Sequence, residues 1–354
     1  MSVRRIAIVS PESSGGARHT VEKLIKGLRR EGFFVEQLSL RGNVLMQTIN
    51  DLVNASLLRE YDAIIYTGSI PRASSLVARS RAKVLLFVHG FVLHEIAGAL
   101  RTSTSLREMA GSLYLAFSWN IGRALKVVDL YICHSITLCE ENGLKKDFVL
   151  LPQYIFPEEL EKYIEFEEAP KSDKGNRPGV RVVTYSSFAI SPRLLPIYHI
   201  VALLRSTSRM VGSRSVELTV IDPRLNERRE ERWGNLIVRY VKFLPRREFL
   251  KLLASADLYV ERCIDEELRM SSIEAGLLGI PVAKLTHPKF VARQDYGDEV
   301  LWSSSPRELV DVLADYIANV EYWKPYYAKK LRNFLATRRS WDSVKKPLVD
   351  FLKA

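Results

Sequence analysis

Short apolar runs alternate with amphipathic stretches along this chain, and the alternation occurs twice. The first series opens with the apolar run RIAIVS and continues into ARHTVEKLIKGLRREG, where apolar side chains recur at helical spacing and Gly32 marks the end of the helix. The apolar runs are rich in Val, Ile and Leu, which is typical of parallel strands buried on both faces. Each series therefore predicts a Rossmann-like parallel sheet that is covered by helices.

A polar segment at 157–179, PEELEKYIEFEEAPKSDKGNRPG, separates the two series. Its acidic composition, marked by Pro and Gly, is that of a linker. A chain of 354 residues has room for two domains of about 150 residues each. We therefore expect an α/β protein with one Rossmann-like domain over 1–165 and a second over 180–335. Ligands should bind in the cleft that such halves leave, beside helix N-termini.

The net charge of +11 is unevenly distributed. Residues 1–150 carry 19 Lys and Arg against 13 Asp and Glu, and residues 323–354 carry 9 against 2. This excess suits an anionic substrate, an acidic membrane surface or nucleic acid, although solvated helix faces would give the same counts. The basic residues lack the interleaved aromatic residues of a recognisable nucleic-acid module, so we expect no specific nucleic-acid partner.

The three cysteines, Cys133, Cys139 and Cys263, form no CxxC pair and no even framework. This pattern predicts three buried thiols in a reducing compartment. The opening residues MSVRRIAIVS pass from a basic pair directly into a strand-like run, without the features of a signal peptide. We therefore expect a cytoplasmic protein.

Two glutamates, Glu266 and Glu274, stand eight residues apart in EELRMSSIEAGLLGIPVAKL. The preceding run ADLYVERC predicts a buried strand, and a helix should begin at Ser271 or Ser272. Ser271 and Glu274 have the spacing of a capping box, in which Glu274 would only bond backbone N–H groups. In the alternative, the two carboxylates accept hydrogen bonds from vicinal hydroxyls of a sugar and a ribose.

The Glu-x7-Glu segment and the following AGLLGIPVA resemble the corresponding segment of family 4 retaining glycosyltransferases. Those enzymes have the GT-B fold, in which two Rossmann-like domains face a central cleft. Other stretches resemble the family in the expected order: SPESSGGARHTVEKLIKGLRREGFFV, VLLFVHG, VRYVKFLPRREFLKLLASADLYV and RRSWDSVKKPLVDFL. The last of these resembles the closing Ser-Trp helix, which implies that residues 336–354 return to the first domain.

The resemblance also implies roles for individual residues. Glu274 would hold the nucleotide ribose, with Ser271 in the same donor-binding segment. Glu266 would hold donor-sugar hydroxyls and stabilise the reacting centre, with His89 near the donor sugar. Gly15 and Gly16 would bring backbone close to the donor phosphates and the acceptor.

The activity implied is that of a hexosyltransferase. It would move a sugar, with retention, from a UDP- or GDP-linked donor to an acceptor such as a lipid-linked or other anionic glycan. No metal and no cofactor are implied, because basic side chains and a helix N-terminus would neutralise the leaving diphosphate.

The chain departs from the family at the loop that supplies those basic groups. The family has Arg and Lys in a G-R-x4-K-G loop, and here Ser187 and Pro192 stand at those positions in YSSFAISPRLL. Arg193 and Arg269 are the candidates to meet the diphosphate in their place. The departure leaves open a second class of protein, a non-catalytic glycosyltransferase-like binding or scaffold subunit.

A long helical stretch over 102–127, TSTSLREMAGSLYLAFSWNIGRALKV, mixes large apolar residues with basic ends. Its apolar face could insert shallowly into a membrane while Arg101, Arg107, Arg123 and Lys126 meet acidic headgroups. Burial of that face against the first sheet explains the pattern equally well. Peripheral membrane contact is therefore one of two expectations for this helix.

Overall fold

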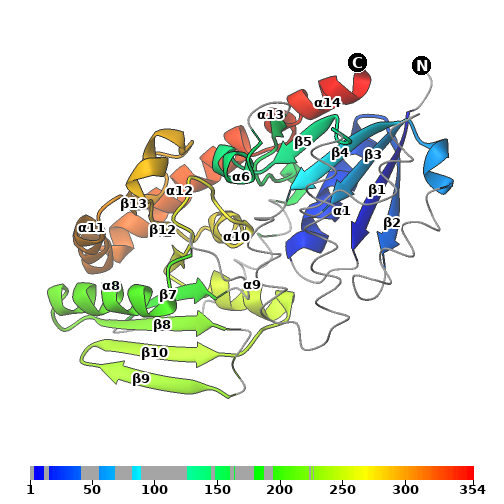
Figure 1. Ribbon diagram of the computed structural model, residues 1–354. Helices are drawn as coiled ribbons and strands as arrows, with labels where there is room; N and C mark the ends of the chain where they lie inside the picture. The colour runs from blue at the N-terminus through cyan, green and yellow to red at the C-terminus, as the bar shows by residue number, and fades with distance from the viewer. Residues whose placement is uncertain are drawn as a thin grey trace. The chain divides into compact units, whose positions relative to one another are not determined.

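The computed structural model describes residues 4–11, 16–40, 56–67, 82–88, 126–144, 148–159, 163, 179–186, 194–222, 225 and 227–354 (Figure 1). The chain divides into two compact units. The first consists of Met1–Pro152 together with Trp341–Ala354, and the second is Gln153–Ser340. Of the helices in the described ranges, none is long and apolar enough to cross a membrane. The helix predicted over 102–127 lies almost wholly outside the described residues.

The described part of the first unit is built on a parallel sheet with the strand order β2-β1-β3-β4-β5-β6. Consecutive residues of the central strand β1 are buried, which is the signature of a sheet covered on both faces. The strands are β1 (Arg5–Pro11), β2 (Phe34–Leu40), β3 (Ala63–Thr67), β4 (Lys83–Val88), β5 (Leu130–Cys133) and β6 (Phe148–Leu150). Among the described residues before 152, the helical segments are α1 (Gly16–Arg30), η1 (Leu57–Glu60) and α6 (Ile136–Glu141).

Two short helices from the other end of the chain, α13 (Trp341–Val344) and α14 (Lys346–Lys353), complete this first unit. The Trp341 side chain packs so closely on α1 that a Cβ atom built on Gly27 would lie 2.7 Å from the indole ring. The indole Nε1 donates a hydrogen bond to Glu31 at 3.1 Å. From β4, Lys83 donates to the carbonyl of Phe351 at 2.9 Å. The helices α13 and α14 are therefore integral to the first core.

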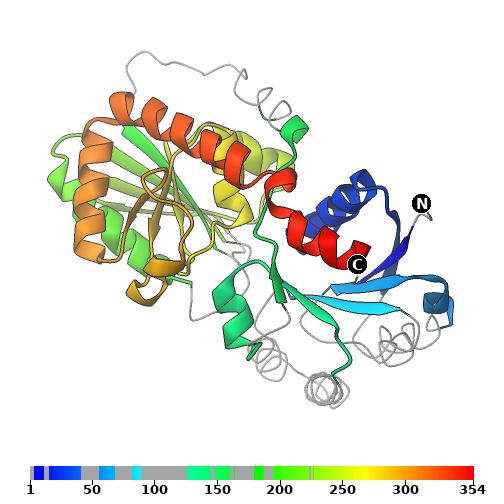
Figure 2. The ribbon, with the colours of Figure 1, turned by 90° about the horizontal axis from the view of Figure 1, so that it is seen from above.

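The second unit has a sheet with the strand order β13-β12-β11-β7-β8-β10-β9, in which β9 alone is antiparallel to its neighbour. The strands are β7 (Gly179–Tyr185), β8 (Ser215–Ile221), β9 (Arg229–Trp233), β10 (Leu236–Val241), β11 (Leu258–Glu261), β12 (Val282–Leu285) and β13 (Leu301–Ser303). The helices that the structure describes in full here are α8 (Ile197–Met210), α9 (Arg246–Ala254), α10 (Met270–Leu277), η2 (Pro288–Arg293), α11 (Pro306–Ala318) and α12 (Val320–Arg338). Figure 2 shows this unit from above.

Alternate residues of the central strand β11 point to two different hydrophobic layers. Leu258 and Val260 belong to the layer under α8 and α11, whereas Tyr259 belongs to the layer under α9 and α10. The period of two arises because successive strand side chains point to opposite faces of the sheet. Both faces of this sheet are thus covered by helices, as predicted.

Local signals locate one helix start correctly and miss one strand. Ser305 caps α11 by accepting from the backbone N–H of Glu308 at 3.5 Å, with Pro306 at the first helical position, and this spacing of Ser, Pro and Glu is a helix-start signal in the sequence. The strand β9 was not predicted, because its sequence REERW lacks apolar alternation. It is an edge strand, and charged side chains on an edge discourage pairing with another chain.

The prediction of three free thiols is wrong, because Cys133 and Cys139 form a disulfide. Cys133 ends β5, and Ser135 then caps α6 by accepting from the N–H of Leu138 at 3.2 Å. The tight turn brings the Cα atoms of the two cysteines to 6.0 Å, within the usual range for a disulfide. Cys263 is a free, buried thiol. Two of the three cysteines therefore no longer support a reducing compartment.

Replacing Cys139 with Ser should lower the free energy of unfolding by about 2 kcal/mol, because the disulfide closes a short loop in the unfolded chain. Denaturant titration of the oxidised protein and of the variant measures the difference. Adding a strong reductant to the unfolded protein before refolding should destabilise the wild type and leave the variant unchanged. Equal sensitivity of both proteins to the reductant would contradict the prediction.

Candidate donor-binding site

The loop from β11 to α10 holds the two glutamates singled out from the sequence. It follows the carboxyl end of a central parallel strand, which is where ligands bind in open α/β sheets. Glu266 lies in the loop and Glu274 lies in α10, and both side chains are buried. Buried acidic residues are rare unless they are paired, so each demands an explanation from its surroundings.

The helix α10 starts differently from the prediction. It begins at Met270, and the residue at the cap position is Arg269, whose side chain makes no capping hydrogen bond. Ser271 lies inside the helix and accepts a hydrogen bond from the Tyr259 hydroxyl at 2.7 Å. The capping-box interpretation of Ser271 and Glu274 is therefore wrong, because Ser271 lies within the helix and not at its cap. Glu274 needs another explanation than capping.

The Glu274 carboxylate forms an ion pair with α9. The Arg246 Nη2 atom lies 2.6 Å from Glu274 Oε1, and the same nitrogen donates to the Tyr163 hydroxyl at 3.1 Å. Burial raises the pKa of Tyr163 above its ordinary value, so this phenol is neutral at physiological pH. Neither Arg246 nor Tyr163 was predicted from the sequence. The clue that was available is the position of Arg246 after Pro245, at a helix start beside a predicted strand end.

Glu266 stands between two other acidic residues whose side chains are fully buried and paired with cations. Arg269 Nη2 lies 2.8 Å from Asp265 Oδ2, and its Nη1 lies 3.3 Å from Glu267 Oε2. Lys284, on β12, donates to the backbone carbonyl of Glu267 and lies 3.8 Å from Asp265. The neighbours of Glu266 on both sides are therefore fixed by charge pairing beneath the loop.

Arg269, the second candidate for the diphosphate, is also held by sulfur. Its Nη2 atom lies 3.1 Å from Cys263 Sγ, and the Cys263 thiol donates to Asp265 Oδ1 at 3.0 Å. Burial raises the pKa of Cys263 to about 12, so the thiol keeps its proton. About a third of the Arg269 side chain stays exposed. The Arg269 guanidinium thus stabilises the loop through contacts with other residues of the loop. Any contact with a donor would come from the exposed third of its side chain.

The buried acid Glu267 should make stability fall as pH rises. Burial raises its pKa to about 7, against the lowering effect of Arg269. The unfolded chain releases this proton near pH 4 and the folded chain near pH 7, so the folded state binds more protons between those values. The free energy of unfolding should therefore decrease from pH 4.5 to 7, by on the order of 2 kcal/mol.

Glu267→Gln should flatten this decrease, because Gln cannot release a proton. Denaturant titrations at intervals across the pH range measure the slope. Glu248→Gln, an exposed acid in the first turn of α9, is the matched control and should keep the wild-type slope. A Glu267→Gln protein with an unchanged slope would assign the pH dependence to another group.

The other predicted site residues belong to parts of the chain that are only partly described. Gly16 is the first residue of α1, directly after β1 and its loop, as the strand-to-helix turn predicts. Gly15, His89 and Arg193 lie outside the described residues, and so do Ser187 and Pro192. Their roles stay predictions. Within the described ranges, no group of three or more His, Cys, Asp or Glu side chains is arranged to hold a metal ion.

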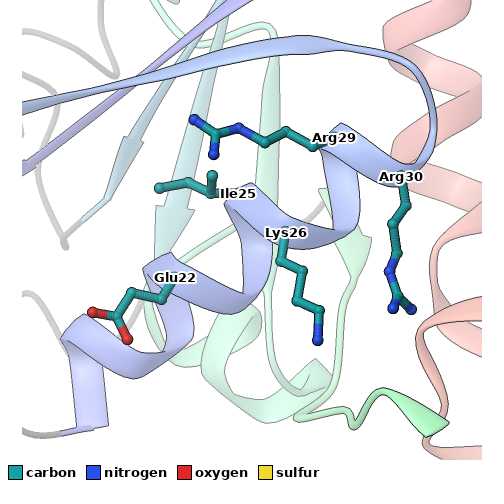
Figure 3. Close-up of a pocket in the computed structure, with 5 residues that line it drawn as sticks. All are labelled: Glu22, Ile25, Lys26, Arg29 and Arg30. Carbon is teal, nitrogen blue, oxygen red and sulfur yellow. The ribbon is translucent and has the colours of Figure 1, made fainter. Parts of the chain in front are cut away.

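A separate hollow of about 550 Å³ lies on the surface of α1 (Figure 3). It is lined by side chains of that one helix: Glu22, Ile25, Lys26, Arg29 and Arg30. The Arg29 guanidinium donates to the carbonyl of Val35 at 2.7 Å, so it is part of the packing between α1 and β2. None of the residues predicted from the sequence lines this hollow, and we assign it no role in the site.

Solved structures share this fold over nearly the whole chain. HepE from Anabaena, in complex with UDP and glucose, matches with a TM-score of 0.60 at 13% identity, and 99% of each chain is covered. WaaG, a glycosyltransferase involved in lipopolysaccharide biosynthesis, matches at 0.58 and 14%, covering 99% of this chain and 100% of that one. The catalytic domain of starch synthase IV from Arabidopsis thaliana, bound to ADP and acarbose, matches at 0.62 and 10%, with 99% of each covered.

No protein-family model matches the sequence, and a search of curated proteins found no match. The likeness is therefore structural, and it shows that the chain has the GT-B fold. The fold predicted from the sequence is confirmed.

Proposed function

We propose that this protein is a glycosyltransferase that moves a sugar from a nucleotide-sugar donor to an acceptor. The observation that supports it most is the buried pair Glu266 and Glu274 at the carboxyl end of β11, within a GT-B fold. HepE, which has the same fold, was solved with UDP and glucose, so a UDP-linked donor is the first to test. We further propose membership of family 4, retention at the anomeric carbon and a hexose as the transferred sugar.

In this proposal Glu274 accepts hydrogen bonds from the ribose hydroxyls, and Glu266 accepts them from the donor sugar. A buried carboxylate also stabilises the positive charge that develops at the anomeric carbon as the bond to the diphosphate breaks. Arg193 and the exposed part of Arg269 are proposed to face the diphosphate. No metal is needed if these cations and a helix N-terminus carry its negative charge.

The remaining proposed contacts are those of Gly15, Gly16 and His89. Gly15 and Gly16 would let backbone approach the phosphates and the acceptor, because a glycine has no side chain to obstruct them. His89 would lie near the donor sugar. The acceptor is proposed to be a lipid-linked or other anionic glycan, in keeping with the excess of basic residues at 1–150 and 323–354. A cytoplasmic location with peripheral membrane contact would suit such an acceptor.

A second candidate function follows from the loop after β7. Ser187 and Pro192 replace the two basic residues that the family uses against the diphosphate. A chain without that charge could bind a nucleotide or glycan and perform no transfer. The non-catalytic reading therefore predicts weak discrimination between a nucleoside and its diphosphate.

A thermal-shift screen of UDP, GDP, ADP and their hexose conjugates tests both candidates. A ligand at about 100 times its Kd should add about 2.7 kcal/mol of apparent stability. If the phosphate site exists, UDP should stabilise the protein far more than uridine does. Equal stabilisation by uridine and UDP would favour the non-catalytic subunit. If no compound stabilises the protein, the proposed donor site is contradicted.

A further inference from the structure

The buried Glu274 carboxylate has a cationic partner on another element. The Glu274 side chain is only 5% exposed, and an isolated carboxylate at that depth would take up a proton rather than remain charged. Arg246 supplies the compensating charge, with its Nη2 atom 2.6 Å from Glu274 Oε1. Arg246 lies in the first turn of α9, which packs beside α10 in the layer shared with β11.

Arg246 is itself held in place. Its Nη2 atom donates to the hydroxyl of Tyr163, a buried residue that packs into the core shared by α9 and α10. Half of the Arg246 side chain remains exposed, so the guanidinium lies at the border between the buried carboxylate and solvent. A fixed guanidinium at one carboxylate oxygen restricts the rotation of the carboxylate, which sets the direction of its lone pairs.

We infer that Arg246 is a positioning residue of the donor site, which keeps Glu274 ionised and oriented to accept the ribose hydroxyls. The inference rests on the proposed function for its ligand, a nucleoside diphosphate. A carboxylate accepts hydrogen bonds from two vicinal hydroxyls, whereas a protonated acid turns one oxygen into a donor. Loss of Arg246 should therefore weaken Glu274 as a hydrogen-bond acceptor for the ribose hydroxyls.

Two phenols also face Glu274, those of Tyr163, from the residues before β7, and of Tyr259, from β11. Burial raises the pKa of both phenols well above the physiological range, so both are neutral between pH 5.5 and 8.5. The positive charge of Arg246 does not change over this range either. In the wild type, the charges of Arg246 and of these two phenols should therefore be constant from pH 5.5 to 8.5.

The first test compares UDP affinity in Arg246→Gln and wild type at pH 5.5, 7 and 8.5. Arg246→Gln should weaken UDP binding at least tenfold at pH 5.5, with part of the loss recovered at pH 8.5 as Glu274 ionises. Arg246→Lys should retain most of the affinity, because it restores the charge. Arg247→Gln, the exposed neighbour on α9, is the matched control and should bind like the wild type. An equal loss at every pH, an unchanged affinity or a tighter affinity would overturn the inference.

The second test needs no nucleotide. Without Arg246, burial favours the protonated form of Glu274, so the folded state holds a proton that the unfolded chain releases, and stability is lost as pH rises. Arg246→Gln should therefore lower Tm more at pH 8 than at pH 5. On a Glu274→Gln background the same substitution should have no pH-dependent effect. If this pattern holds and no nucleotide binds the wild type, the proposed function fails while the control of Glu274 by Arg246 stands. If nucleotide binds and the pattern is absent, the inference fails and the proposed function stands.

Discussion

Glu266→Gln should abolish sugar transfer and leave nucleotide affinity nearly unchanged. Removing one group that stabilises developing charge typically costs a factor of 10² to 10³ in turnover, or about 3–4 kcal/mol. The loop should keep its shape in this variant, because Asp265 and Glu267 on either side remain paired with Arg269 and Lys284. The loss would then arise from charge and not from misfolding. Release of the nucleoside diphosphate from the donor sugar measures transfer, and calorimetric titration with UDP measures affinity.

Glu267→Gln is the matched control, since it changes the adjacent carboxylate, which is paired beneath the loop. It should retain most of the turnover at neutral pH, where Glu267 is already partly protonated. A large loss of UDP affinity in Glu266→Gln would assign Glu266 to the nucleotide. Full turnover in Glu266→Gln would show that the Glu266 carboxylate takes no part in the reaction.

Trp341→Ala should lower the free energy of unfolding of the first unit by about 3–5 kcal/mol. The Trp341 side chain is 1% exposed, and its indole lies against Gly27. Truncation leaves a cavity that the backbone of α1 cannot fill, and it also removes the hydrogen bond to Glu31. Denaturant unfolding followed by circular dichroism measures the loss.

Two further variants test whether that loss of stability arises from the buried indole. Tyr322→Ala removes an aromatic side chain that is 67% exposed on α12, and it should cost far less. Gly27→Ala should also destabilise, because the added methyl group would meet the indole ring at 2.7 Å. If Trp341→Ala unfolds like Tyr322→Ala, the indole contributes little to the core.

The fold could be predicted because its signals are local and repeated. Apolar runs such as RIAIVS and VRVVTY indicate strands that are buried on both faces of a sheet, and this signal does not depend on distant residues. Glu266 and Glu274 were also accessible from sequence, since their spacing and the apolar run behind them resemble a known segment. The predicted start of α10, at Ser271 or Ser272, was wrong. The Ser271 hydroxyl instead accepts from Tyr259, twelve residues earlier, and this tertiary contact leaves no signal in the sequence.

The rest of the site depends on pairs that are distant in sequence. Lys284 stands in the run IPVAKLT, where nothing distinguishes it from an ordinary strand lysine, yet it is fully buried under Glu267. Arg246 lies 28 residues before Glu274 and meets it only once α9 and α10 pack on one face of the sheet. Charge pairing of this kind is a property of the packed structure and leaves no periodic pattern in the sequence.

The return of α13 and α14 to the first unit bears on how the chain folds during its synthesis. The second unit is one continuous stretch, Gln153–Ser340, and can reach its native state as soon as it has left the ribosome. The first unit begins earlier but still lacks Trp341, which covers Gly27, until residues 341–354 have been translated. The unit that is made first should therefore be completed last, with the surface of α1 around Gly27 uncovered and open to chaperones in the meantime. A fragment that ends at Pro152 should remain in that unfinished form.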